Sequence, residues 1–165
     1  MNFKVKNRHR LKDKDSRYIL KELKENFENI NFKKNLSFEI GEVEGINFIF
    51  INDDPCFFYY DGKIIFTLLG LKKFKPINKF VIVDMGAVKF VTNGADVMAP
   101  GIVNADKKIV ENEQVWVCDE RNKKPLAIGI ALMTGEQMIK EKKGKSIRII
   151  HYVGDSIWNF VAKSL

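Results

Sequence analysis

The chain has 165 residues, of which 45% are hydrophobic and 30% are charged. This length suits one ordinary domain or two small ones, and the hydrophobic share excludes a disordered chain because it can form a buried core. Lys and Arg number 28 against 21 Asp and Glu, and the net charge of +7 favours a polyanionic partner such as RNA, DNA or an anionic membrane, unless it serves solubility alone.

The N-terminal segment combines a basic arm, residues 4–14, with a helix. The arm is too charged for a signal peptide, and it could be solvated and disordered or lie along rRNA. Asp13 or Asp15 is expected to cap the helix, in which apolar residues recur at helical spacing from Ile19 to Ile30.

From Leu36 the pattern changes to short strands rich in β-branched and aromatic residues. The expected strands lie within residues 37–45, 46–53 and 55–69. Asp61 and Gly62 between two apolar runs are a strong hairpin signal. Residues 71–78 are interpreted as a basic linker, so the sequence predicts a small α+β domain over residues 1–75.

A second domain is predicted over residues 76–165. A buried strand, residues 80–83, meets Asp84, which suits the N-cap of a short helix over residues 86–92. Gly94 can close this helix in the left-handed conformation. Further strands are expected at residues 98–103, 114–120, 125–135 and 146–153. The whole is therefore expected to be a compact, β-rich barrel.

No catalytic, metal-binding or cofactor-binding residue is identified. Cys56 and Cys118 stand alone in apolar runs and are expected to be buried free thiols in a reducing cytosol. His151 lies between apolar residues and is better explained as a satisfied strand histidine than as a general base. The motifs HExxH, GxGxxG, GxSxG and the Walker loop are missing, and no apolar run reaches the roughly 18 residues of a membrane span. We therefore expect a cytoplasmic protein that is not an enzyme and has no cofactor, metal or membrane partner.

Three motifs carry a resemblance to a known domain. VDMGAVKFVTNGADVMAPGI begins at Val83, and a hydrophilic turn, VWV and GIALMT follow it. Their order and spacing resemble the PUA domain, an RNA-binding module, over residues 79 to about 158. The preceding unit of about 75 residues and the ending GDSIW make the whole chain similar to the malignant T-cell amplified sequence family. That family includes a translation machinery-associated protein of yeast and short archaeal relatives.

The resemblance implies an RNA-facing surface on the helix and the glycine loop after it. Small residues there allow RNA to approach exposed backbone N–H groups. The residues that the resemblance assigns to this surface are Lys89, Phe90, Thr92, Asn93, Gly94, Ala95, Asp96, Val97 and Met98, with Pro100 and Gly101 shaping it.

Nearby cations are candidates for phosphate contacts. They are Lys107, Lys108, Lys142, Lys143, Lys145 and Arg148. The first two could equally be a hairpin tip, and residues 142–145 could be a solvated helix end, where cations favour the helix dipole.

The resemblance implies a non-catalytic RNA-binding protein of the translation apparatus. It would bind the small ribosomal subunit, the tRNA acceptor end or both, so the RNA that it contacts would be tRNA or rRNA. It would act in translation initiation or recycling. In eukaryotic relatives a protein with an initiation-factor-like domain is the partner. The alternative is a tRNA-binding accessory subunit of an RNA-modification enzyme, a transglycosylase or a pseudouridine synthase. Co-purified small-subunit proteins or a co-purified catalytic subunit would separate these two hypotheses.

Overall fold

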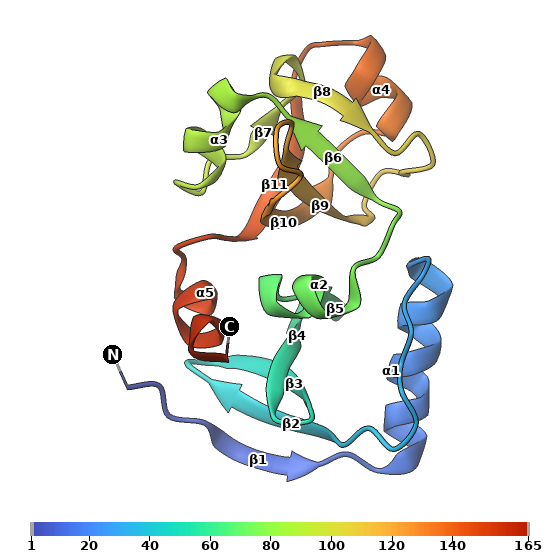
Figure 1. Cartoon of the computed structure of the whole chain (residues 1–165), viewed down its shortest axis with the longest axis vertical. Coiled ribbons are helices and arrows are strands. Elements are labelled where there is room, and N and C mark those ends of the chain that lie inside the picture. The colour runs from blue at the N-terminus through green and yellow to red at the C-terminus, as the bar shows by residue number, and fades with distance from the viewer. Residues whose placement is uncertain (1, 165) are drawn as a thin grey trace. The chain divides into compact units, whose positions relative to one another are not determined.

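The computed structural model describes residues 2–164. The chain forms two compact units, residues 2–76 with 160–164 and residues 77–159, and Figure 1 shows the sheet in each of them. The predicted second domain runs to residue 165, whereas residues from 160 onward group with the first unit. The reason is aromatic packing: the Phe160 ring lies 5.5 Å from the Phe3 ring and 4.9 Å from the Phe48 ring, between centroids.

The first unit contains a five-stranded antiparallel sheet in the order β1-β2-β3-β4-β5. Its strands are β1 (Lys6–Arg10), β2 (Phe38–Val43), β3 (Ile46–Ile51), β4 (Asp54–Tyr60) and β5 (Lys63–Phe66). Asp61 and Gly62 have φ angles of 48° and 73° between β4 and β5. Positive φ at both central residues is what a tight hairpin turn requires, so the predicted hairpin is confirmed.

The N-terminal arm contains an edge strand. β1 pairs antiparallel with β2 and all five of its residues are exposed, so the arm is not disordered there. Polar and charged side chains on such an edge discourage pairing with another chain. α1 (Asp13–Asn26) follows, with Lys12 at its N-cap and no side-chain cap bond. The predicted capping by Asp13 or Asp15 is therefore wrong; both lie in the first turn, where carboxylates favour the helix dipole.

α2 (Leu68–Phe74) occupies the first half of the segment, residues 71–78, that was interpreted as a linker. Thr67 forms its N-cap: the hydroxyl oxygen accepts the Gly70 N–H at 3.0 Å and the hydroxyl donates to the Pro55 carbonyl at 2.8 Å. Gly70 and the nearby Pro76 weaken the helical pattern in the sequence. The helix forms because the cap and the packing of its buried face against β4 outweigh that weakness.

The second unit is a six-stranded sheet in the order β7-β11-β10-β9-β6-β8. Its strands are β6 (Phe80–Val83), β7 (Val97–Met98), β8 (Ile102–Ala105), β9 (Gln114–Asp119), β10 (Pro125–Ala131) and β11 (Lys145–Tyr152). Among its strand pairs β6 and β9 are parallel and the others antiparallel. α3 (Met85–Val91) follows β6 directly. The predicted α+β class, with a short helix after the first strand of a β-rich unit, is confirmed.

Shorter helical elements include α4 (Gly135–Lys140), α5 (Ser156–Val161) and the 3₁₀ turn η2 (Ala162–Ser164). A further 3₁₀ turn, η1 (Ala99–Gly101), divides the strand that was predicted at residues 98–103 into β7 and β8. That prediction is wrong because Pro100 has no N–H to donate to a strand ladder and fixes its φ at a helical value.

Each unit has its own hydrophobic core. The first is aromatic, and Phe48, Phe57, Phe58 and Phe66 are at most 2% exposed. The second is mainly aliphatic. Each core also encloses one free cysteine, Cys56 in the first unit and Cys118 in the second, which confirms the prediction of buried thiols.

Candidate nucleic-acid interface

A pocket of about 490 Å³ lies between α3 and the segment that follows it. Asp84 joins its two sides. The Asp84 Oδ1 accepts the Ala87 N–H at 2.9 Å, which caps α3 as predicted, and the Asp84 N–H donates to the Gly101 carbonyl at 2.9 Å. The first turn of α3 is thereby held against η1. The pocket is lined by Asp84, Gly86, Ala87, Phe90, Val91, Ala95, Asp96, Val97, Met98, Pro100 and Gly101.

The two glycines of the loop allow close packing. Gly94 has φ = 86°, which confirms the predicted left-handed end of α3, and a Cβ there would lie 2.7 Å from the Tyr152 ring. At Gly101 a Cβ would lie 3.1 Å from the Cβ of Ala87. Gly94 therefore packs on Tyr152 outside the pocket lining, whereas Gly101 lets the two pocket walls approach each other.

The surface of the pocket is apolar and partly open. Phe90 is 57% exposed and Met98 is 49% exposed, and most of the other lining residues are small or apolar. The Lys89 Nζ lies 5.2 Å from the centroid of the Phe90 ring. An exposed aromatic ring beside a hollow, with a cation over the ring, suits the stacking of an unpaired base.

Three charged side chains beside the pocket already have partners in the protein. The Asp96 Oδ1 accepts the Ile149 N–H at 2.9 Å, and its Oδ2 lies 3.0 Å from the Lys145 Nζ. The Lys142 ammonium donates to the Ile102 carbonyl at 3.0 Å. Of the predicted phosphate ligands, Lys145 is thus paired with the lining residue Asp96, and Lys142 is bonded to the backbone of Ile102.

The structure gathers part of the predicted surface. The predicted residues that line the pocket are Phe90, Ala95, Asp96, Val97, Met98, Pro100 and Gly101. Those at the end of α3 and in the turn after it, outside the lining, are Lys89, Thr92, Asn93 and Gly94. The Thr92 hydroxyl donates to the Val88 carbonyl at 3.0 Å, so it stabilises the helix end.

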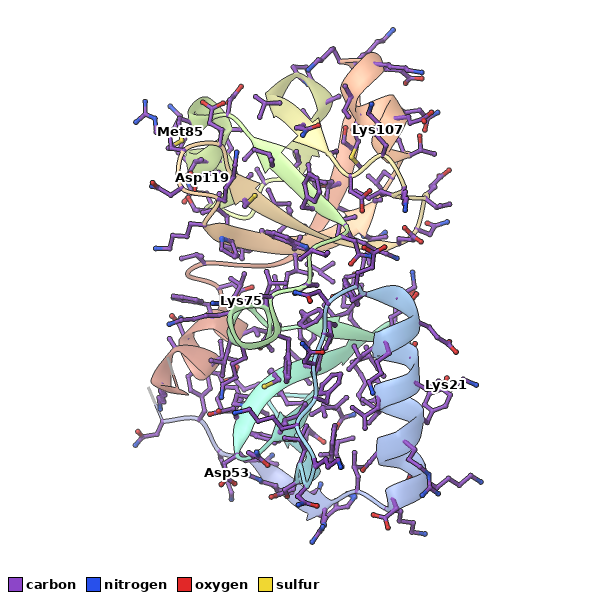
Figure 2. All side chains as sticks on the ribbon, turned by 45° about the vertical axis from the view of Figure 1, so that its right-hand side comes forward. Lys21, Asp53, Lys75, Met85, Lys107 and Asp119 are labelled. Atoms are coloured by element: carbon purple, nitrogen blue, oxygen red, sulfur yellow. The ribbon has the colours of Figure 1, made fainter. Side chains whose placement is uncertain are left out.

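The predicted cations fall into two groups. Pairing of β7 with β11 sets Lys145 opposite Met98, so the segment 142–145 runs beside the pocket, and the exposed Arg148 follows on β11. Lys107 and Lys108 come after β8, and Figure 2 shows Lys107 across the second unit from Met85 at the start of α3. Those two lysines are not at the pocket, since β8 carries the chain away from η1.

Four lining residues were not predicted as site residues: Asp84, Gly86, Ala87 and Val91. The signal for two of them was in the sequence, because small residues such as Gly86 and Ala87 in the first turn of a helix leave room for a ligand. Asp84 was assigned only its cap role, and its position in the wall follows from the bond to Gly101.

The histidine and the two cysteines of the cores are buried. His151 is fully buried, with its Nδ1 2.9 Å from the Asp155 Oδ2, which confirms the prediction of a satisfied strand histidine. Burial raises the pKa of the Cys56 thiol to about 12 and that of the Cys118 thiol to about 11, so both are protonated at neutral pH. Over residues 2–164 no group of three potential metal ligands is found. None of the helices described there has the length and apolarity to cross a membrane.

Comparison with known proteins identifies both units. Residues 79–153 match the PUA domain family, and residues 7–74 match a family described as a domain of unknown function (DUF1947). An uncharacterised protein of Methanocaldococcus jannaschii is 47% identical over 158 residues, which are 94% of this chain and 98% of that protein. Translation machinery-associated protein 20 of Saccharomyces cerevisiae is 35% identical over 67% of this chain and 64% of its own length. Malignant T-cell-amplified sequence 1 of Rattus norvegicus is 32% identical over 70% of this chain and 66% of its own length.

Solved structures show the same fold over nearly the whole chain. A hypothetical protein of Pyrococcus horikoshii has a TM-score of 0.82 at 36% identity, covering 93% of this chain and 99% of that one. A conserved PUA domain protein of Thermoplasma acidophilum has a TM-score of 0.80 at 27% identity, covering 94% and 99%. The protein therefore has a PUA domain, an RNA-binding fold. The chain belongs to the family of PUA-domain proteins that includes translation machinery-associated protein 20 and malignant T-cell-amplified sequence 1.

Proposed function

We propose that the protein is a non-catalytic RNA-binding protein of the translation apparatus. It holds an unpaired RNA end, in the first place the tRNA acceptor end, in the pocket beside α3, and it docks on the small ribosomal subunit in initiation or recycling. The observation that carries the proposal is the apolar pocket with the exposed Phe90 ring in a PUA fold. The name of the yeast relative supports the translation role. The resemblance of the chain to that family supports the cytoplasmic location and an initiation-factor-like partner.

The pocket suits a base better than a phosphate. Its open side presents the Phe90 ring and the Met98 side chain, and the neighbouring Lys145 is neutralised by Asp96. Stacking of one base on an aromatic side chain contributes about 1–3 kcal/mol. Lys89 and Lys143 are exposed and could meet the phosphates that flank the bound base. The non-catalytic role is supported by the protonated thiols and the buried, paired His151.

The test is binding to isolated small ribosomal subunits, with and without deacylated tRNA. We expect saturable binding that tRNA strengthens, and the Phe90→Ala variant should lose about tenfold of the tRNA-dependent affinity, because a stacking contact of about 1.4 kcal/mol is removed. Tyr18→Ala is the matched control, since Tyr18 is also an exposed aromatic residue, 66% exposed, but belongs to α1 and does not line the pocket.

Two results would contradict the proposal. If the wild type and Phe90→Ala had equal tRNA-dependent affinities, the pocket would not be part of the RNA interface. Binding to free tRNA without binding to ribosomal subunits, together with co-purification of a catalytic subunit, would favour the accessory role in RNA modification.

A further inference from the structure

A second hollow, of about 360 Å³, lies entirely within the first unit. It is bordered by α1 and by the loop that leads from α1 to β2, which run side by side in Figures 1 and 2. We call it the α1 groove. Its lining residues are Arg10, Leu11, Asp13, Ser16, Arg17, Leu20, Lys24, Phe32, Lys33, Lys34, Asn35, Leu36 and Phe38.

The rim of the α1 groove is strongly basic. Its exposed cations are Arg10, Arg17, Lys24, Lys33 and Lys34, and its single carboxylate is that of Asp13. Five basic residues against one acidic residue leave an excess of four. Residues 1–76 contain 15 basic and 11 acidic residues, which is the same excess. The positive charge of the segment is therefore not spread evenly, because the α1 groove accounts for all of it.

Three cations of the first unit outside the rim form ion pairs, and within the described part of the chain the rim cations do not. Arg8 pairs with Glu39 at 2.7 Å, Lys73 pairs with Asp54, and Lys21 lies 3.9 Å from Glu25. Over residues 2–164, none of the five rim cations forms such a pair. Like charges gathered round one hollow repel one another, and a bound polyanion would relieve that repulsion.

The loop that carries Lys33 and Lys34 is held in place at both ends. The Phe32 ring packs on the Phe74 ring, with centroids 4.8 Å apart. The Ser37 N–H donates to the Asn52 Oδ1 at 2.9 Å, and the Asn52 N–H donates to the Ser37 carbonyl at 3.0 Å. The loop therefore does not have to be ordered when a ligand binds, which lowers the entropic cost of binding.

We infer that the α1 groove binds the sugar–phosphate backbone of RNA. The guanidinium groups of Arg10 and Arg17 can each donate two parallel hydrogen bonds to a phosphate, and the three lysines add point charges round them. The inference rests on the proposed function in one respect, that RNA is the ligand of this protein. It adds an electrostatic contact in the first unit to the base contact of the second unit.

The test uses the full chain and a blunt 20-base-pair RNA duplex, which offers phosphates but no unpaired base. Binding is measured across a salt series for R17Q/K24Q and for K14Q/K21Q. Both pairs lie seven residues apart on α1 and lose the same charge, but Lys14 and Lys21 are outside the groove lining, and Figure 2 shows Lys21 extending outward from the helix. If all five rim cations contact phosphates, the wild-type log–log slope should be about −4.5.

R17Q/K24Q should make this slope shallower by about 2, with a matching loss of affinity, while K14Q/K21Q should leave it near the wild-type value. Thermal unfolding curves like that of the wild type would show that both variants fold. If the salt slope changed equally in the two variants, only the net charge of the protein would matter. If the slope did not change in R17Q/K24Q, the groove would not be part of the RNA interface. Binding of poly-L-glutamate that only R17Q/K24Q weakens, with an unchanged RNA slope, would assign the groove to an acidic protein. Each of the last three outcomes would overturn the inference.

The Phe90→Ala variant separates this test from that of the proposed function. It should bind the blunt duplex like the wild type and lose affinity only for RNA with an unpaired end. If R17Q/K24Q weakens RNA binding and Phe90→Ala does not, the proposed base pocket is contradicted and the inference about the groove stands. If only Phe90→Ala weakens binding, the groove is contradicted and the base pocket stands.

Discussion

The pocket in the second unit and the α1 groove in the first unit use charge in opposite ways. Beside the pocket, Lys145 is paired with Asp96 and Lys142 is bonded to a backbone carbonyl, so the exposed surface is mainly apolar. Round the groove, five cations form no ion pair with any of the residues 2–164. A base has a π-face and little charge, whereas a phosphate carries a full charge, so the pocket suits the first and the groove suits the second.

This difference shows why net charge alone is a poor guide to a binding site. The sequence has dense lysine clusters both before β11 and on the N-terminal segment. From the sequence alone, both clusters would be expected to bind a polyanion equally well. In the structure Lys145 of the first cluster is paired with Asp96, and Lys142 donates to the Ile102 carbonyl. The salt dependence of binding should therefore come mainly from the first unit, and the discrimination of unpaired ends from the second.

The largest expected effect comes from substitutions that disrupt one unit at a time. A Cβ at Gly70 would lie 2.0 Å from the Cys56 carbonyl oxygen, and a Cβ at Gly135 would lie 1.9 Å from the Asp106 carbonyl oxygen. Because both neighbours are backbone atoms, Gly70→Ala and Gly135→Ala should each destabilise their own unit by about 3 kcal/mol.

The two buried thiols report which unit has opened. The wild-type protein should react slowly with a thiol reagent at pH 8, because both thiols are buried and have raised pKa values. Gly70→Ala should speed the labelling of Cys56, and Gly135→Ala that of Cys118, as read by mass spectrometry of the peptides. Simultaneous exposure of both thiols in either variant would show that the units unfold together.

A smaller and pH-dependent effect is expected in the second unit at Asp119. The pKa of this buried carboxyl is lowered, because the Asn122 N–H donates to it at 2.6 Å and the Lys124 N–H at 3.0 Å, while burial opposes the shift. A lowered folded-state pKa means that the carboxylate stabilises the fold above its unfolded-state pKa of about 3.9, and that this contribution is lost as the pH falls through the folded value.

Asp119→Asn should therefore lower the free energy of unfolding by about 1–2 kcal/mol at pH 7, since an amide oxygen replaces a charged acceptor. The difference from the wild type should shrink as the pH falls below about 4, first because the unfolded-state carboxyl becomes protonated and then, at the lower folded-state pKa, because the wild-type carboxyl of the folded protein does too. Urea unfolding followed by tryptophan fluorescence measures it, because Trp116 and Trp158 both lie in the second unit. A difference that stays the same at pH 7 and pH 3 would assign the effect to shape rather than charge.

The smallest effect is expected from a substitution that removes the ion pair beside the pocket, so that a lysine there becomes unpaired like the cations of the α1 groove. Asp96→Asn keeps an oxygen for the Ile149 N–H but leaves Lys145 without its carboxylate partner. The log–log salt slope for an RNA hairpin with an unpaired 3′ end should then become steeper by about 1, as measured by fluorescence anisotropy. D96N/K145Q should return to the wild-type slope. A slope that D96N does not change would mean that Lys145 is too far from the bound phosphates to act on them.

Much of the fold could be predicted from local pattern. Asp84 before a short apolar helix, Gly94 at its end, and Asp61 with Gly62 between two strands all act over a few residues, so their roles follow from the sequence. The pocket could be predicted in part for the same reason, because ten of its eleven lining residues lie within one stretch of 16 residues, 86–101, and the other is the cap residue of that stretch.

The sequence by itself therefore determined two units, their α+β character and the position of the glycine loop, because these depend on spacing, turn chemistry and hydrophobic period. Only the tertiary structure decided which charges are available. Asp96 reaches Lys145 because β7 pairs with β11, nearly 50 residues further along the chain, and the α1 groove forms because one loop packs back along α1. Charge pairing depends on distance in space, whereas the sequence gives only distance along the chain.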